Sequence, residues 1–361
     1  MTCNRFVSDP FVAPRVYRLR LTHAKKTSGI MAVSNIRRQL KHTIVGVFGS
    51  SKSHSKMALI NEILNITNKL VNVRELYIDI WHSPHYDLQP LFSSFWSSFG
   101  PKLYTLSLSG ILEDFPTLIN SIPTLNSLQD LRIEFNHSYT GLIQASRTIL
   151  VDLLLPFINN LAPHLSSLRL CSWGYVDLST FFSQLAIFPG LKTLNVRTHF
   201  SNFSDASGLK GLICDSSDTL QSVCLHINLG KSTMDPSAEQ LLSRWLSECI
   251  SDERFFSKLQ VLDIYPTNTA AGMEFLLGCI QRSSTNLVEL IVRDRYLEDQ
   301  EVKTVIDAAS SCHNLTYLRM NIRRLDVGLT DHLALKLPRI NRLWLSVGED
   351  YYFTVLVCIT S

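Results

Sequence analysis

The segment Val45–Lys56, VGVFGSSKSHSK, comes closest to a nucleotide-binding motif. A phosphate-binding loop reads G-x-x-x-x-G-K-[ST] between a strand and a helix, because backbone N–H groups and a lysine surround the phosphates. Gly46, Lys52 and Ser53 stand at this spacing, but Ser51 replaces the second glycine, which lets the backbone turn toward phosphate. No N-K-x-D motif follows. A nucleotide-binding module using residues 46–53 therefore remains the alternative hypothesis, and the pattern favours a polar loop.

Histidines and cysteines offer two further places for chemistry. The segment WHSPHYD has His82 and His85 three residues apart, beside Asp87, but zinc needs three or four ligands with a supporting shell and no cysteine is near. Cys214 and Cys224 have no adjacent base that could activate a thiol. The chain contains no G-x-S-x-G or H-E-x-x-H motif. We therefore expect no metal, no cofactor, no catalytic residue and no enzymatic activity.

A six-residue pattern, apolar-x-x-apolar-x-apolar, recurs along the whole chain. The copies begin at Val16, Val73, Leu103, Leu128, Leu165, Leu191, Leu220, Leu259, Leu287, Leu315 and Ile340, and a weaker copy surrounds HTIVGV at His42. Most copies follow one another after 25 to 30 residues. The final x-apolar-x-apolar portion alternates with period two, so each copy predicts a short strand with one buried face.

Amphipathic helices are predicted between several of these strands. The segments Lys56–Leu70 and Ala238–Cys249 place apolar residues at i, i+3 and i+4, as a helix with one buried face requires. Two intervals are longer, and their polar excess at Asn136–Thr148 and Gly230–Ala238 predicts surface loops. A strand and a helix repeated at this period form the leucine-rich-repeat unit. The predicted fold is an α/β solenoid, or horseshoe, of about 11–12 irregular repeats, with parallel strands on a concave face and helices on a convex face.

The repeats resemble the leucine-rich-repeat region of fungal F-box-type proteins. Segments that carry the resemblance are FPGLKTLNV, SKLQVLDI and CHNLTYLRM, and it extends over roughly residues 14–350. It implies a substrate receptor of an SCF-type ubiquitin ligase, or a remnant of one without its F-box. No F-box is recognisable, so a Skp–cullin adaptor is implied only if an F-box is supplied elsewhere. We expect residues 1–13 to form a tail, 14–350 the solenoid, and 351–361 a tail or a terminal edge strand.

The residues between the apolar strand positions are predicted to face the concave surface. In the C-terminal third they concentrate large side chains of the types that often dominate interface energy: Tyr265, Arg293, Tyr317, Arg319, Arg342 and Trp344. A solvent-exposed sheet without a partner can also carry such residues. The hypothesis is a non-catalytic scaffold that binds an acidic or mixed-charge protein segment there.

Composition places further bounds on function. Hydrophobic residues make up 45% of the chain and charged residues 18%, with a net charge of +3. Residues 1–56 carry eleven Lys or Arg and one acid. That asymmetry is compatible with a solvated surface, a transit peptide or a patch for an anionic partner. Eight cysteines without a C-x-x-C pair favour a reducing compartment, cytoplasm or nucleus. No apolar run reaches the ~18 residues of a membrane helix, so we expect no binding to a membrane. We also expect a monomer that does not bind nucleic acid.

Overall fold

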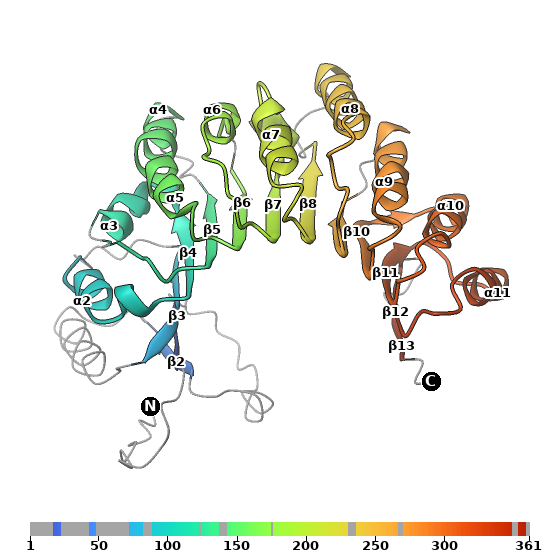
Figure 1. Cartoon of the computed structure of the whole chain (residues 1–361), viewed down its shortest axis with the longest axis horizontal. Coiled ribbons are helices and arrows are strands. Elements are labelled where there is room, and N and C mark those ends of the chain that lie inside the picture. The colour runs from blue at the N-terminus through green and yellow to red at the C-terminus, as the bar shows by residue number, and fades with distance from the viewer. Residues whose placement is uncertain are drawn as a thin grey trace, which may run out of the picture. The chain divides into compact units, whose positions relative to one another are not determined.

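The computed structural model describes residues 17–22, 43–47, 72–81, 89–136 except 121 and 123, 143–229 except 175, 236–265, 270–348 and 353–358. The chain divides into two compact units, Met1–Leu128 and Gln129–Ser361, which are described in turn (Figure 1). Three predicted features lie outside the described residues. They are the predicted helix at 56–70, most of the loop 46–53, and the histidine segment at 82–87.

The first unit contains a parallel sheet of β1 (Tyr17–Thr22), β2 (Thr43–Val47), β3 (Val73–Ile80) and β4 (Thr105–Ile111). The strand order is β4-β3-β1-β2, so β2 does not lie between β1 and β3 as successive repeats would require. The weak copy at His42 is a strand, but its expected place in the solenoid is wrong. Its register pairs Gly46 with Leu21 and Val45 with Arg20. The repeat pattern would instead align Val45 with Leu19, so the register of β2 is offset from the pattern by one residue.

Two short helices complete the described part of this unit. They are α2 (Gln89–Phe99) and α3 (Phe115–Ile119), with 3-10 turns at Gly100–Lys102 and Leu112–Asp114. One face of α2 is entirely buried, and it consists of Leu91, Phe92, Phe95, Trp96 and Phe99. This spacing of three and four residues packs a continuous apolar stripe into the core.

The second unit is a longer sheet built by the repeats. Its strands are β5 (Asp130–Asn136), β6 (Ser167–Ser172), β7 (Thr193–His199), β8 (Ser222–Asn228), β9 (Val261–Ile264), β10 (Glu289–Leu297), β11 (Tyr317–Ile322), β12 (Arg342–Val347) and β13 (Phe353–Cys358). Strands β5 to β12 follow chain order in the sheet. The pairings from β5 to β12 are parallel, whereas β13 pairs antiparallel with β12. The predicted strand positions are thus confirmed, and the last segment forms a terminal edge strand.

Helices lie along one side of this sheet (Figure 1). They are α4 (Ile143–Thr148), α5 (Leu155–Leu161), α6 (Ser179–Ser183), α7 (Ser207–Asp215), α8 (Pro236–Ser251), α9 (Ala270–Ser283), α10 (Asp299–Ala309) and α11 (Val327–Lys336). The helix predicted at 238–249 is confirmed as α8. The predicted loop at 136–148 is partly wrong, because α4 occupies its second half and continues through a π-helical segment, Ile149–Leu154, into α5. Pro156 lies just after the π-helical segment, and a proline cannot donate the backbone hydrogen bond that a regular α-helix requires.

A continuous apolar row joins the sheet to the helices. The register aligns Leu131, Leu168, Leu194, Val223, Leu262, Leu290 and Leu318 on successive strands, and all seven are buried. Burying one such side chain contributes about 1.5–3 kcal/mol. The repeated leucine therefore holds each repeat against the next.

Six cysteine side chains that the structure describes are buried free thiols: Cys171, Cys214, Cys224, Cys249, Cys279 and Cys312. Burial raises the pKa of the Cys249 and Cys279 thiols strongly, so both stay neutral and pack as small apolar groups. Among the helices that the structure describes, none combines the length and apolar character needed to cross a bilayer.

Candidate interaction surface on the open face of the sheet

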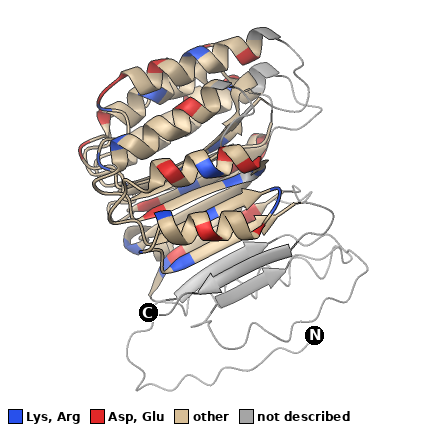
Figure 2. Cartoon of the chain, turned by 90° about the vertical axis from the view of Figure 1, so that its right-hand side faces the viewer, with Lys and Arg blue, Asp and Glu red and all other residues tan. Residues whose placement is uncertain are grey.

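The face of the second sheet opposite the helices carries the polar residues of the strands. We call it the open face. The alternation of side chains and the strand register place one residue of each strand in a row across it: Arg132, Arg169, Asn195, Cys224, Asp263, Ile291, Arg319 and Trp344. A second row contains Glu134, Cys171, Arg197 and His226. Charged residues of both signs occur on these strands as well as on the helices (Figure 2).

Four of the six predicted partner-binding residues come together on β11 and β12. The guanidinium carbon of Arg319 lies 4.8 Å from the ring centroid of Trp344, and that of Arg342 lies 4.7 Å from the ring of Tyr317. Arg342 Nη2 also donates to Glu289 Oε1 over 2.9 Å. Each arginine therefore lies over the aromatic ring of the neighbouring strand, in a cation–π geometry that keeps both groups in place.

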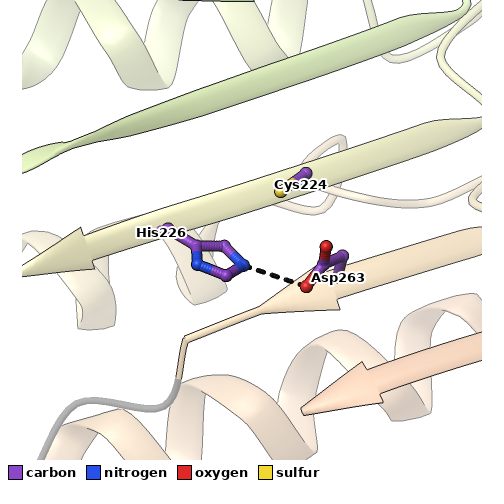
Figure 3. A group of neighbouring side chains, drawn as sticks. All are labelled: Cys224, His226 and Asp263. Carbon is purple, nitrogen blue, oxygen red and sulfur yellow. Dashed lines mark hydrogen bonds and ion pairs between the residues drawn. The ribbon is translucent and has the colours of Figure 1, made fainter. Parts of the chain in front are cut away.

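The other two predicted residues, Arg293 and Tyr265, lie in a second cluster around Asp263. Arg293 Nε donates to Asp263 Oδ1 over 3.1 Å, and Arg293 Nη2 donates to Asp263 Oδ2 over 2.6 Å. His226 Nε2 lies 2.9 Å from Asp263 Oδ1 (Figure 3). The ring of Tyr265 is 6.4 Å from that of His226. Both oxygens of Asp263 are thus engaged, and the guanidinium of Arg293 is used within the chain.

The electrostatics of this cluster keep Asp263 charged. Burial by itself would raise the pKa of Asp263, but the hydrogen bonds and positive charge from His226 and Arg293 outweigh it and hold the pKa at about 2. The side chain of Asp263 is 11% exposed and that of His226 is 8% exposed. A buried carboxylate with these partners is an integral part of the sheet, because removing one partner would leave an uncompensated charge.

Cys224 adds a thiol to this cluster. Donor atoms of Cys224, His226 and Asp263 lie within 4.8 Å of one another, and thiolate, imidazole and carboxylate together are a donor set that zinc accepts. However, Arg293 already binds both oxygens of Asp263, and Arg197 Nη2 lies 3.9 Å from Cys224 Sγ. Two guanidinium groups beside the donors repel a cation. The geometry therefore favours an internal hydrogen-bond network over a metal centre.

Sequence reasoning missed this cluster because its members belong to different repeats. Cys224 and Asp263 occupy equivalent places in the copies LQSVCL and LQVLDI, and the register pairs them directly across β8 and β9. The sequence did contain an indication of the cluster, because Cys224 and Asp263 are both the fifth residue of their copy. Comparing equivalent positions of consecutive repeats, rather than searching each segment alone, would have found it.

The open face of β5, β6 and β7 contains three more arginines. Arg132 Nη2 donates to Asp130 Oδ2 over 2.6 Å, so its charge is compensated. Arg169 Nε donates to Cys171 Sγ over 3.4 Å. Arg197 has its contact with Cys224, and its Nε is buried without a hydrogen-bond partner among the described residues.

The parallel sheet in chain order from β5 to β12, the helix after each strand from β5 to β11 and the continuous leucine row define the fold of the second unit. It is an α/β leucine-rich-repeat solenoid.

Comparisons with known proteins identified similar solved structures. No protein-family model matches the sequence. No curated protein matches it either. The leucine-rich repeat-containing protein LegL7 from Legionella pneumophila is 14% identical, with 81% of this chain and 88% of that chain covered and a TM-score of 0.41. A protein from Bacteroides fragilis is 13% identical, with 86% and 76% covered and a TM-score of 0.42.

Proposed function

We propose that this chain is a non-catalytic scaffold that binds another protein through the open face, around Arg319 and Trp344. The observation that carries the proposal is the pair of stacked contacts on β11 and β12, Arg319 with Trp344 and Arg342 with Tyr317. Arginine, tyrosine and tryptophan are enriched among residues that dominate interface energy. Because the stacks hold these side chains in place, little conformational entropy would be lost on binding.

The charge of Arg319 supports this location. Within the described residues Arg319 forms no ion pair, and its Nε is buried without a hydrogen-bond partner. The ring of Trp344, rather than a carboxylate, positions its guanidinium. An acidic or mixed-charge segment would provide the missing negative charge, while the aromatic rings would supply apolar contact area.

A more specific form of the proposal comes from the resemblance to fungal F-box-type repeats. In that form the chain is the substrate receptor of an SCF-type ubiquitin ligase, or a remnant of one, and its client occupies the open face in the cytoplasm or nucleus. A Skp–cullin adaptor would bind only through an F-box supplied elsewhere. The nucleotide-binding alternative depends on residues 46–53, which lie mostly outside the described residues, and no observation favours it.

Site-directed photo-crosslinking tests the proposed surface. A photo-reactive phenylalanine analogue replaces Asn321, which shares the open face of β11 with Arg319. A matched probe replaces the exposed Lys303 on α10, on the helical side. We expect one protein to be crosslinked from position 321 and not from position 303, and its affinity to fall when Trp344 is changed to Ala. Crosslinking of the same protein only from position 303 would contradict the proposal.

A further inference from the structure

We propose that the open face of β6 and β7 carries a second contact site, where the guanidinium groups of Arg169 and Arg197 bind carboxylates of an acidic segment of a protein partner. This inference rests on the proposed function, because it assigns the chemistry of a partner to the same face of the sheet. Its residues lie on different strands from Arg319 and Trp344. An experiment can therefore refute the proposal for one site without refuting the proposal for the other.

The first step is to find which arginines are available to a partner. Arg132 is bonded to Asp130, with Nε to Oδ2 at 3.1 Å and Nη2 to Oδ2 at 2.6 Å. Arg293 binds both oxygens of Asp263. A guanidinium that already has a bidentate or close carboxylate partner must lose that partner before it can bind another. These two arginines are therefore poor candidates, although their exposure and residue type resemble those of the others.

Arg169 and Arg197 have thiols where the other two have carboxylates. Arg169 Nε donates to Cys171 Sγ at 3.4 Å, and Arg197 Nη2 donates to Cys224 Sγ at 3.9 Å. A thiol sulfur is a weak acceptor. Burial raises the pKa of Cys171, so this thiol carries no charge at neutral pH. Within the described residues neither arginine has a carboxylate within salt-bridge distance, and both positive charges remain uncompensated.

The register brings the two arginines onto neighbouring strands. Arg169 pairs with Asn195, and Cys171 pairs with Arg197, so the two arginines are offset by two residues across strands about 4.8 Å apart. Asn195 is directly opposite Arg169 and two residues before Arg197 on β7. Its Oδ1 is buried without a partner in the described part of the chain. Two planar guanidinium groups in such proximity match carboxylate groups, which accept two parallel N–H bonds.

The surrounding charges favour a short acidic peptide over a nucleic acid. Glu134 pairs in register with Cys171, and its Oε1 accepts a hydrogen bond from Trp173 Nε1 over 2.9 Å. Asp130 lies on the adjacent strand β5 and Asp263 on β9, two strands from β7, and each is already bonded to an arginine. A continuous phosphate backbone along these strands would be repelled by Glu134, and it would find Arg132 and Arg293 already paired with carboxylates. A segment with a few Asp or Glu can place its charges on Arg169 and Arg197 alone.

The test measures fluorescence anisotropy of a labelled hexaglutamate peptide with the full chain, and hexaglutamine is the neutral control. Saturable binding of hexaglutamate is expected, without binding of hexaglutamine. Arg169→Gln and Arg197→Gln should each weaken it by about tenfold, the effect of losing one charge-assisted hydrogen bond. Arg132→Gln changes the net charge equally but removes a compensated arginine, so its effect should stay under about threefold.

Three further variants sharpen the test. Arg197→Lys keeps the charge but not the planar fork, so its binding should fall between the parent and Arg197→Gln. Glu134→Gln should strengthen binding, because it removes the nearest repelling charge. Trp344→Ala should leave the Arg169-dependent part of hexaglutamate binding unchanged, which separates this site from the proposed one. Thermal unfolding of every variant identifies any loss of binding that comes from misfolding.

Several results would overturn the inference. Equal weakening by Arg132→Gln and Arg169→Gln would show that only the general charge of the chain matters. Absence of saturable hexaglutamate binding to the folded parent would show that Arg169 and Arg197 do not form a carboxylate-binding site. Tighter binding of a single-stranded DNA oligonucleotide, lost in Arg169→Gln, would assign the arginines to nucleic acid instead.

Discussion

Two regions of the open face use the same residue type in different ways. On β8 to β10, Arg293 is bonded to the buried Asp263, which also contacts His226. On β6 and β7, Arg169 and Arg197 contact only thiols among the acceptors that the structure describes. The difference arises from the acceptor within reach: β9 supplies a carboxylate to Arg293, whereas Arg169 meets a thiol on its own strand and Arg197 meets one on β8. The availability of an arginine to a partner therefore depends on which acceptor its own strand or the adjacent repeat places beside it.

The largest expected effect is on stability at Asp263. Asp263→Ala should lower the free energy of unfolding by about 3–5 kcal/mol, because it leaves Arg293 partly buried and without its carboxylate. Urea denaturation followed by circular dichroism gives this value. The control is Asp130→Ala, whose partner Arg132 has a side chain 40% exposed, so its cost should be about 1 kcal/mol or less. Equal costs at both positions would contradict the distinction between a structural and a surface pair.

The apolar side of the same strands should not distinguish the two regions. Leu168 on β6 and Leu262 on β9 are both fully buried in the leucine row. Leu168→Ala and Leu262→Ala should each cost ~2–5 kcal/mol. Hydrogen exchange should show the loss in the mutated repeat and its neighbours, since repeat stability is a sum of local terms. A cost under about 1 kcal/mol at both sites would mean that the register is wrong.

Acid should weaken the Asp263 region selectively. The pKa of Asp263 is about 2 in the folded chain, below its unfolded value of roughly 3.9. Because the folded-state pKa is depressed, this stability is fully present above the unfolded pKa and is lost as pH falls through the folded one. The loss should reach roughly 2 kcal/mol between about pH 5 and pH 2. Unfolding measured across this range should be flatter in Asp263→Asn, and an unchanged slope would show that Asp263 is not the titrating group.

The smallest expected effect concerns Arg169. Arg169→Gln removes an uncompensated charge, so the free energy of unfolding should change by no more than about 0.5 kcal/mol. Thermal and urea unfolding of this variant beside Asp263→Ala measure both regions under one set of conditions. A loss of more than about 2 kcal/mol would indicate that Arg169 has a structural partner and is not available for binding.

Much of the fold could be predicted because the leucine pattern expresses it directly. Leu168 and Leu262 occupy the same phase of their repeats, and both are buried as that phase requires. The order of β1 and β2 could not be predicted, because the copy at His42 fits the pattern but pairs with an offset of one residue. Helix α4 was missed because its short sequence, IQASRT, is too polar to show a helical stripe.

The candidate site was only partly predictable. The sequence identified Arg319 and Trp344 as neighbours on consecutive strands, and the structure places the guanidinium over the ring. It could not show that Arg293 is bonded within the chain, because Arg293 is two residues beyond the partner of Asp263 in the register and reaches it only diagonally. Contacts of this kind depend on side-chain rotamers as well as on register. The repeat pattern determines the register but not the rotamers.

The measurement that tests the central claim most directly is the affinity of the crosslinked partner for three variants, measured by titration calorimetry. We predict that Arg319→Glu and Trp344→Ala each weaken binding by more than tenfold while the circular dichroism spectrum stays unchanged. Lys303→Glu, on the exposed side of α10, should bind like the parent. The opposite pattern, with normal binding by both open-face variants and none by Lys303→Glu, would contradict the assignment of the partner to the open face.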